Sequence, residues 1–555
     1  MDGKINSKPQ SFYGFPSNVP IQLKQAYAQR GIKKLFQWQS ECLSDSSLFA
    51  PEYSNLIYSA PTSAGKTLIA EVLAACNCLE TGRRTIFVLP YISVAREKLL
   101  YLQSLWRSIG LVVKPFIGAS STSVNGWSAA VCTIEKANAL LNALIEVDSA
   151  HEIGTVVVDE LHILFESERG AVVENLIAKL LFISRQNNSS NKIQIIGLSA
   201  TLGDDELHKM LANWIDARTF QTEFRPLELH EYLVHENGHI FNLIDNGEKC
   251  RELDQNFLIK GDNKCIIGIT LEALLQSQSI LIFCPTKAEA EQSAILLAKY
   301  LKYCLDKGEA NRFPTLSTIL PREKISEAIE YFRQKNACSE RDLLQCIGQG
   351  VAFHHAGLTI EEREVIEALF RSGHLRVLVS TSTLSSGVNL PAHRVLIRTS
   401  AGGPVPLSFV TYSQMVGRAG ESYLLCNAND WLAVQRQIQR RTFNRPKRTF
   451  GRLLLETINS SLCKNLGDVN NLIEDCLFSQ QARSLDEELT YLIQLKVITL
   501  GGDSLAEFDE EKSDIDNINV QNQPGIGADN SFDKQTTTKS TLVTPVNNLA
   551  INENS

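Results

Sequence analysis

The feature that most constrains the fold is a series of short apolar runs, most of them rich in β-branched residues, separated by spans with helical spacing. In the first half of the chain they occupy residues 56–58, 85–89, 130–133, 155–158 and 193–198. A second series occupies residues 279–283, 350–353, 375–379 and 395–397. Continuous apolar strands that alternate with helices predict an α/β protein with parallel sheets covered on both faces. Such sheets carry their functional residues at the carboxyl ends of the strands, so the residues after each run are the candidates.

A phosphate-binding loop is predicted directly after the first run. Its residues are Ala60, Pro61, Thr62, Ser63, Ala64, Gly65, Lys66 and Thr67, and a helical span follows at 68–75. In a strand, loop and helix of this kind, backbone N–H groups and the positive helix N-terminus bind phosphate. We expect Lys66 to reach the β- and γ-phosphates of ATP and the Thr67 hydroxyl to bind Mg²⁺. Ala60 stands where the usual pattern has glycine, and a lone Gly-Lys-Thr also occurs by chance. Whether this loop binds a nucleotide therefore depends on motifs elsewhere in the chain.

Two carboxylates follow the run at 155–158 and are the natural partners of this loop. We expect Asp159 to hold Mg²⁺, directly or through water, and Glu160 to polarise the water that attacks the γ-phosphate. The alternative is a pair of carboxylates that only cap a helix N-terminus. The presence of Lys66 and Thr67 upstream favours the first interpretation, in which Asp159 binds Mg²⁺ and Glu160 acts as the general base.

Further polar residues lie near these motifs. Gln39, upstream of the loop, can pair with both a ring nitrogen and the amino group of adenine, although a surface glutamine is often only solvated. The segment 199–201 is either a helix cap or a relay of hydroxyls that senses the loss of the γ-phosphate. Thr133 and Lys136 could contact a nucleic-acid backbone.

The second series of runs supplies its own candidates. Arg418, three residues after Met415 and four after Gln414, could enter the ATP site from a second domain and stabilise transition-state charge. The Gly-, Ser- and Thr-rich stretch 381–391, which includes Gly387, suits close approach to a phosphate or a nucleic-acid backbone. His354 and His355 have no third or fourth ligand at suitable spacing, which favours a packed pair over a metal site.

Composition limits the class of protein more than its function. The 555 residues are 44% hydrophobic and 21% charged, and the net charge of −8 argues against coating nucleic acid by bulk charge. No apolar run approaches the roughly 20 residues that span a bilayer, and the N-terminus lacks a secretory signal, so no membrane partner is expected. The 13 scattered cysteines indicate a reducing compartment rather than zinc or a disulfide framework.

The same patterns divide the chain. We predict a flexible N-terminus at 1–11, a first α/β lobe at 12–226, a second lobe at 227–428, a small helical module at 429–500 and a disordered tail at 501–555. Within the second lobe, residues 227–262 are interpreted as the junction between lobes and residues 302–343 as a helical insertion. The basic stretch 436–452 is either a solvated face or a site of phosphate contact.

In their order, these motifs make the chain similar to superfamily 2 helicases of the branch that unwinds DNA from a 3′ overhang. Within that branch it resembles the helicase-like domain of DNA polymerase theta and the related DNA-repair helicase that lacks a polymerase. The segments that carry the resemblance are residues 36–42, 58–67, 158–162, 350–359 and 381–392. The similarity covers residues 12–425, with a weaker winged-helix likeness over residues 450–500.

The resemblance implies two tandem RecA-like lobes that bind ATP and Mg²⁺ between them and carry single-stranded DNA across their top. Closure on ATP and opening after hydrolysis would move the protein along one strand from 3′ to 5′. A strand-separating β-hairpin should lie within residues 398–411. Such helicases act in the nucleus on single-stranded and branched DNA, with repair-protein partners, at stalled forks and in the end joining of breaks.

The chain departs from the family pattern in three places. Gly420 runs directly into Glu421, where the pattern continues with a second arginine and a short loop. A splice form or an imperfectly assembled gene would explain this, and comparing the transcript with the genome across the join tests it. A polar tail stands where the family has a DNA-gripping helical domain, and polymerase activity is not expected of this chain. Two alternatives therefore stay open: a hydrolysis-impaired nucleic-acid-binding protein, and an RNA helicase of the same superfamily.

Overall fold

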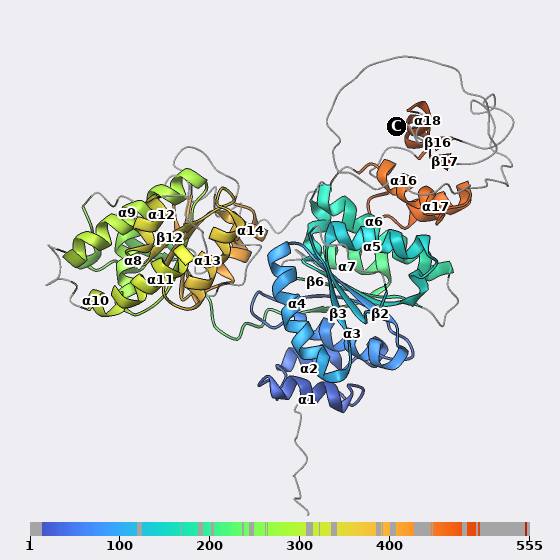
Figure 1. Cartoon of the computed structure of the whole chain (residues 1–555), viewed down its shortest axis with the longest axis horizontal. Coiled ribbons are helices and arrows are strands. Elements are labelled where there is room, and N and C mark those ends of the chain that lie inside the picture. Colours follow the sequence, from blue (N-terminus) through green and yellow to red (C-terminus); the bar gives the residue numbers. More distant parts are fainter. Residues whose placement is uncertain are drawn as a thin grey trace, which may run out of the picture.

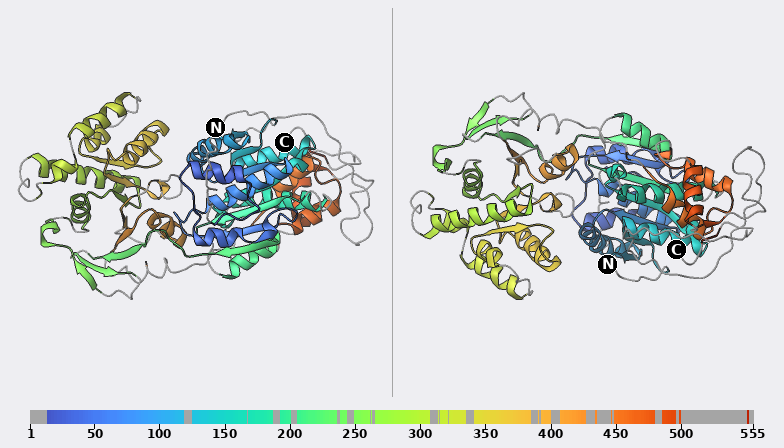
Figure 2. Two further views of the ribbon diagram at one scale, coloured as in Figure 1. Left: turned by 90° about the horizontal axis from the view of Figure 1, so that it is seen from below. Right: turned by 90° about the horizontal axis from the view of Figure 1, so that it is seen from above.

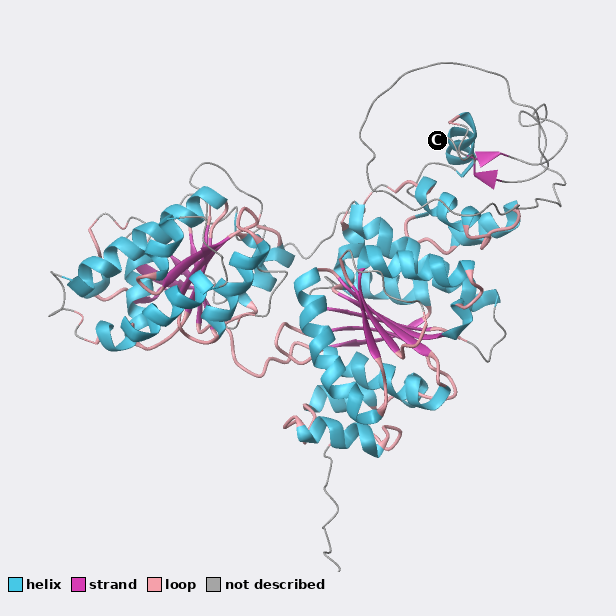
Figure 3. Ribbon diagram, in the orientation of Figure 1, coloured by secondary structure: helices cyan, strands magenta, loops and turns pink. Residues whose placement is uncertain are grey.

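The chain forms two α/β lobes and a smaller helical unit (Figures 1 and 3). The computed structural model describes residues 14–118, 125–166, 168–186, 192–200, 205–235, 238–243, 249–260, 262, 265–306, 313, 315–320, 322–334, 341–384, 390, 392–399, 407–426, 434, 446, 448–479, 485–495, 498–499 and 550–551. The expected α/β class with two tandem lobes is confirmed.

The first lobe is built on a seven-stranded sheet in the order β3-β4-β2-β5-β6-β1-β7, with every neighbouring pair parallel. The strands are β1 (Asn55–Ser59), β2 (Arg84–Leu89), β3 (Val113–Phe116), β4 (Ala129–Thr133), β5 (Ile153–Asp159), β6 (Gln194–Ser199) and β7 (Ala217–Gln221). Each apolar run predicted in the first half of the chain is one of these strands.

Helices cover both faces of this sheet, as the continuous apolar runs require. One face packs against α1 (Ile21–Gln29), α2 (Gln37–Leu43), α3 (Thr67–Thr81) and α4 (Ile92–Trp106), and the other against α5 (Ile134–Glu146), α6 (Glu168–Gln186) and α7 (Asp205–Ile215). The central strand β5 shows why an apolar run without alternation indicates a sheet that is covered on both faces. Val157 joins the core of the first face, whereas Val156 and Val158 join the core of the second.

The second lobe is built on an eight-stranded sheet in the order β10-β9-β8-β15-β14-β11-β13-β12. The strands are β8 (His230–Val234), β9 (His239–Asn242), β10 (Lys249–Glu252), β11 (Ile280–Phe283), β12 (Val351–His354), β13 (Val377–Ser380), β14 (Arg394–Arg398) and β15 (Glu421–Leu425). Its helices are α8 (Ile266–Leu275), α9 (Lys287–Asp306), α10 (Leu316–Ile319), α11 (Arg322–Gln334), α12 (Arg341–Ile347), α13 (Ile360–Arg371) and α14 (Phe409–Val416).

The interpretation of residues 227–262 as a simple junction is wrong. This span contributes β8, which pairs in parallel with β15, and the antiparallel strands β9 and β10 at the edge of the sheet. Its short, mixed apolar runs lacked the continuous apolar character of the buried strands, because an antiparallel edge is only partly covered. The expected helical character of residues 302–343 is confirmed by the end of α9 and by α10, α11 and α12.

The third unit comprises α16 (Gly451–Asn459), α17 (Leu466–Glu474) and α18 (Leu485–Gln494), with β16 (Ile498–Thr499) paired antiparallel to β17 (Ala550–Ile551). Although it follows the second lobe in sequence, it lies on the first lobe, above α5 and α6 (Figures 1 and 2). Its apolar residues Leu453, Leu472 and Leu489 belong to the same core as α5 and α6. We call residues 448–479 and 485–495 of this unit the C-terminal module.

Several predicted segments fall partly or wholly beyond the described residues. The N-terminus before residue 14, residues 400–406 of the predicted hairpin and all of the predicted tail except residues 550–551 lie there. Among the described helices, none is both long enough and apolar enough to cross a bilayer.

Candidate active site

The predicted phosphate loop joins the buried strand β1 to α3, which begins at Thr67. Two of its residues, Ser63 (φ 66°) and Gly65 (φ 80°), have left-handed backbone conformations that turn the loop back on itself. The Tyr58 hydroxyl donates to Lys66 O at 2.6 Å, and Lys66 Nζ donates to Pro61 O at 3.2 Å. The loop is therefore held in a wrapped form, with the Lys66 amine against its own backbone.

Two features of the loop fit a bound triphosphate. Within the part of the chain that the structure describes, the buried Thr62 hydroxyl has no hydrogen-bond partner. A Cβ at position 65 would lie only 2.7 Å from Gln39 Nε2, so only glycine allows this approach. Burial lowers the pKa of Lys66, and the Glu160 and Asp159 carboxylates oppose that effect. The cradle thus combines backbone N–H groups, a hydroxyl and one buried ammonium.

Gln39 lies where the sequence places it, next to the loop, but both ends of its amide are engaged. Gln39 Oε1 accepts from the backbone N–H of Phe36, and Gln39 Nε2 donates to Gly65 O, each at 2.9 Å. The side chain therefore fastens the start of α2 to the phosphate loop, a part that sequence reasoning missed. The expected contact with adenine stays a prediction.

An aromatic pair beside Gln39 was also missed. The rings of Phe36 and Phe224 lie 5.0 Å apart, and both side chains stay about two-fifths exposed, at 41% and 38%. Phe224 belongs to the segment that joins β7 to β8 and hence the first lobe to the second. Exposed aromatic faces next to a phosphate loop are suited to stacking on a nucleotide base. No sequence spacing connects residues 36 and 224.

Asp159 is the last residue of strand β5, Glu160 follows it, and both lie close to Lys66. Glu160 has a left-handed backbone (φ 54°) and begins the 3₁₀ turn η4 (Leu161–Phe165). Burial and the Glu160 carboxylate raise the pKa of Asp159. Burial would also raise the pKa of Glu160, but His162 and Lys66 outweigh it and lower that pKa. The pair thus differs in proton affinity, with Glu160 kept ionised.

His162 links the Glu160 carboxylate to the second lobe. Its Nδ1 lies 3.0 Å from Ser199 Oγ and 3.3 Å from Glu160 Oε2, and Gln414 Nε2 lies 3.4 Å from its Nε2. Ser199 is thus placed as a relay would require, whereas Thr201 lies outside the described residues. The sequence pointed to His162 only through its place two residues after Glu160, and assigned it no role.

The second lobe reaches the phosphate loop through the end of α14. Ser63 Oγ lies 3.4 Å from Gly417 O, and a Cβ on Gly417 would lie 1.5 Å from Thr62 Oγ1. Arg418 follows, partly buried, and lies in the field of the Glu160 and Glu97 carboxylates. Burial lowers the pKa of Arg418 to about 10, so the guanidinium stays charged at neutral pH. Of the second-lobe candidates, Gln414 and Arg418 thus meet the first lobe, and Gly387 lies outside the described residues.

The join after Gly420 has a defined structure. Glu421 begins strand β15 and pairs in register with Arg394 of β14. Arg394 Nε lies 2.8 Å from Glu421 Oε2, and Arg394 also contacts Glu272. Glu421, the residue directly after Gly420, therefore pairs its charge with an arginine of the second lobe.

His354 and His355, which the sequence analysis interpreted as a packed pair, are both buried. His354 Nε2 lies 3.0 Å from Glu367 Oε1, and His355 Nε2 lies 2.8 Å from Glu291 Oε1. In the described part of the chain, no cluster of three or more His, Cys, Asp or Glu side chains could hold a metal ion. Mg²⁺ needs no such cluster, because it binds through one or two protein oxygens together with water and substrate phosphates.

Comparison with known families agrees with this geometry. Residues 38–210 match the DEAD/DEAH box helicase family, and residues 311–422 match the helicase conserved C-terminal domain. Together the two matches cover more than half of the chain. The first lobe therefore carries a DEAD/DEAH box helicase domain, and the second carries a helicase C-terminal domain. These domains class the chain as an ATP-hydrolysing enzyme.

Several relatives are similar over most of the chain. Mouse DNA polymerase theta is 41% identical over 453 residues, which are 77% of this chain and 17% of that protein. Human Helicase POLQ-like is 33% identical over 509 residues, 86% of this chain and 43% of that protein. The ATP-dependent DNA helicase Hel308 of Pyrococcus abyssi is 31% identical over 410 residues, 73% of this chain and 51% of that protein. The chain thus spans from about a sixth to about half of the length of these relatives.

Proposed function

We propose that the chain is an ATP-dependent DNA helicase or translocase that moves from 3′ to 5′ on single-stranded and branched DNA. The observation that carries this proposal is the meeting of the two lobes at the phosphate loop, where Gln414 Nε2 lies 3.4 Å from His162 Nε2 and the Glu160 carboxylate acts on the partly buried Arg418. An arginine and a carboxylate from different lobes, meeting at a phosphate loop, make ATP turnover depend on lobe closure. DNA as the substrate is supported by the similarity to Hel308, which is named as an ATP-dependent DNA helicase.

The residues divide the work of hydrolysis among them. The loop N–H groups and Lys66 bind the phosphates, and Thr67 and Asp159 are suited to hold Mg²⁺. When bound, Mg²⁺ withdraws charge from the phosphate oxygens. Glu160, kept ionised by His162 and Lys66, accepts a proton from the attacking water. Arg418 stabilises the negative charge that develops on the transferred phosphoryl group.

The contact from Gln414 through His162 to Glu160 offers a route from the catalytic carboxylate to the second lobe. Ser199 lies on the same histidine nitrogen as Glu160. A change in charge at Glu160 during the reaction would therefore alter the hydrogen bonds of both Ser199 and Gln414. We propose that this exchange triggers the opening of the lobes after hydrolysis, which is the step that moves the strand.

The first test is steady-state ATP hydrolysis by the purified chain with and without single-stranded DNA. Glu160→Gln serves as the blank, and Lys66→Ala tests the phosphate loop. Turnover that DNA stimulates and that both substitutions abolish is the expected result. Turnover unchanged by Lys66→Ala would refute the assignment of the loop. Stimulation by RNA in place of DNA would refute the choice of substrate, since the 2′-hydroxyl distinguishes the two backbones.

A second candidate is a nucleic-acid-binding protein with impaired hydrolysis. The observation that favours it is that Glu421, which directly follows Gly420 where the resemblance predicts a second arginine and a short loop, begins strand β15 and pairs with Arg394. Loss of one transition-state arginine can cost about three orders of magnitude or more in turnover. DNA binding without turnover above the Glu160→Gln blank would establish this candidate.

The biological setting follows from the same relatives. We propose a role in DNA repair, such as end joining of breaks or repair of forks, with repair proteins as partners and the nucleus as the location. The similarity to DNA polymerase theta and Helicase POLQ-like supports this. Fluorescent tagging of the chain before and after DNA damage tests it, and exclusion from the nucleus under both conditions would refute it.

A further inference from the structure

The turn that follows the catalytic carboxylates is fastened at its far end by the C-terminal module. Arg448, at the start of this module, donates from Nη1 to Glu166 O at 2.8 Å and from Nη2 to Leu164 O. Its Nε lies 2.9 Å from Glu174 Oε2, and both side chains are only 2% exposed. A single guanidinium thus holds two carbonyls of the turn and one buried carboxylate.

The carboxylate partner is itself fixed by the module. Glu174, on α6, accepts at Oε1 from the backbone N–H of Phe478 at 2.8 Å. The Phe478 ring lies under the Arg448 guanidinium, 5.3 Å from its carbon to the ring centroid, and packs against Phe165 of the turn. The module therefore encloses the end of η4 with an ion pair, a ring and a backbone hydrogen bond.

The other end of the same turn is catalytic. It begins at Glu160 in a left-handed backbone conformation, which persists only where the surroundings determine it. His162, inside the turn, contacts Glu160 and Gln414. A short 3₁₀ turn with one end fixed by Arg448 leaves little freedom to Glu160 at the other end.

Close packing makes this arrangement sensitive to small changes. A Cβ on Gly170 of α6 would lie 2.5 Å from Ile163 O, 2.7 Å from Leu164 O and 2.7 Å from Arg448 Nη2. Only a glycine lets α6, the turn and the guanidinium meet at this point.

We infer that Arg448 is a positioning residue for ATP hydrolysis. It holds the turn that carries Glu160 in place only while the C-terminal module is docked on the first lobe. This inference rests on the proposed function and adds a dependence of the ATP site on a unit outside both lobes. It also changes the interpretation of the basic stretch 436–452. Two of its arginines, Arg448 and Arg452, pair with Glu174 and Glu456 of the protein itself.

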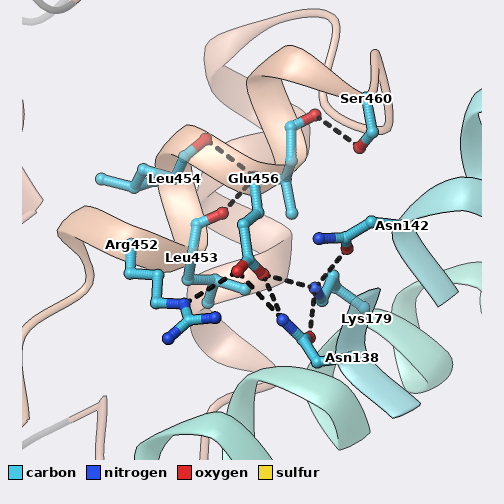
Figure 4. A network of polar contacts seen from close by, with 9 residues as sticks. Asn138, Asn142, Lys179, Arg452, Leu453, Leu454, Glu456 and Ser460 are labelled. Atoms are coloured by element: carbon cyan, nitrogen blue, oxygen red, sulfur yellow. Dashed lines mark hydrogen bonds and ion pairs between the residues drawn. The ribbon is translucent and has the colours of Figure 1, made fainter. Parts of the chain in front are cut away.

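A second polar network provides the control (Figure 4). Lys179 of α6, fully buried, donates to Asn138 Oδ1 at 2.6 Å, to Asn142 Oδ1 at 2.7 Å and to Glu456 Oε2 at 2.8 Å. Arg452 Nε and Asn138 Nδ2 also contact Glu456. This network joins the same module to the same lobe, but the contacts just described for it lie away from the Glu160 turn in sequence and join only α5, α6 and α16. It is matched to the Arg448 contact in charge and in the burial of its cation, since the side chains of Lys179 and Arg448 are 0% and 2% exposed.

The experiment compares two double variants that remove each ion pair without leaving a buried charge unpaired. They are Arg448→Met with Glu174→Met, and Lys179→Met with Glu456→Gln, in the full chain. DNA-stimulated kcat, KM for ATP and thermal unfolding are measured for both. We expect the first variant to lose kcat by about tenfold or more, with KM for ATP changed by less than about threefold. The control should keep the parent kcat.

Equal losses of kcat in both variants would overturn the inference, because docking alone would then explain them. A parent kcat in a folded first variant would also overturn it. Hydrogen exchange of the amides of residues 161–166 tests whether Arg448 fixes the Glu160 turn, even if the parent chain shows no turnover. Faster exchange there in the first variant alone supports the inference, and equal exchange in both refutes it. Absence of turnover in the parent would instead count against the proposed function.

Discussion

The contact between the two lobes requires glycine at position 417, where a side chain larger than one hydrogen atom does not fit. Gly417 faces Thr62 of the phosphate loop so closely that an added Cβ would lie 1.5 Å from Thr62 Oγ1 and 2.7 Å from Thr62 Cβ. Rotation of the Thr62 side chain can move the hydroxyl but not its Cβ. Because carbon atoms in contact lie about 3.5–4.0 Å apart, Gly417→Ala must hold the lobes about 1 Å too far apart.

The expected loss of activity follows from this displacement. A reacting group misplaced by about 1 Å costs on the order of 100-fold in rate, or about 3 kcal/mol of transition-state stabilisation. Gly417→Ala should therefore lower kcat for ATP by about 100-fold, because Arg418 cannot reach the γ-phosphate. Binding of ATP should change little, because Lys66 and the loop belong to the first lobe alone. Steady-state kinetics and equilibrium nucleotide binding measure the two effects separately.

Two further variants test whether the clash with Thr62 causes the loss of activity. Gly420→Ala is the matched control, because its Cβ would meet nothing closer than Glu228 O at 3.8 Å. Thr62→Gly removes both atoms that clash, so it should restore part of the activity of Gly417→Ala in the double variant. Thermal unfolding checks that the variants are folded, since the added Cβ would also lie 2.9 Å from Ser413 O. Turnover of Gly417→Ala within about threefold of the parent would refute the reasoning.

Three other predictions follow from single contacts. Phe36→Ala should weaken ATP binding several-fold but leave the binding of inorganic triphosphate unchanged, since only ATP carries a base to stack; equal losses for both ligands would contradict this. Glu71→Gln should lower the free energy of unfolding by about 3 kcal/mol in denaturant titrations, because the buried Glu71 pairs with Lys98 and accepts from the Tyr27 hydroxyl at 2.9 Å; a change below about 1 kcal/mol would count against it. Burial raises the pKa of Asp475 to about 6, so the folded state binds the proton more tightly than the unfolded state does. The free energy of unfolding should therefore fall as pH rises from about 4 through 6. Asp475→Asn should flatten this part of the plot of stability against pH, and a plot parallel to that of the parent would refute the assignment of the effect to Asp475.

The parts of the site that were predictable are those that a few consecutive residues encode. Strand β5 could be found because its alternating sides are both buried, so every residue of 155–158 is apolar or Thr. The loop ending in Lys66 and Thr67 could be found because a strand, a glycine turn and a helix N-terminus follow one another directly. Asp159 and Glu160 could be paired with that loop because parallel strands end at the same edge of a sheet.

Other features depend on the environment of each residue and could not be predicted. The amide of Gln39 joins α2 to the phosphate loop, and no spacing in the sequence indicates this role. Arg448 was one of several arginines in a basic stretch, and only its burial beside Glu174 separates it from solvated neighbours. The strands β8, β9 and β10 lacked a clear pattern because they form the partly covered edge of the second sheet.

By itself, the sequence determined that two parallel-sheet lobes follow one another and that a phosphate loop, a pair of carboxylates and an arginine lie at strand or helix ends. These are local properties, set by apolar periodicity and by residue types at short spacing. Only the tertiary structure decided that Gly417 meets Thr62, that His162 meets Gln414, and that the C-terminal module docks on the first lobe. Such contacts join residues hundreds of positions apart, and their energy depends on shape and burial that no short stretch of chain contains.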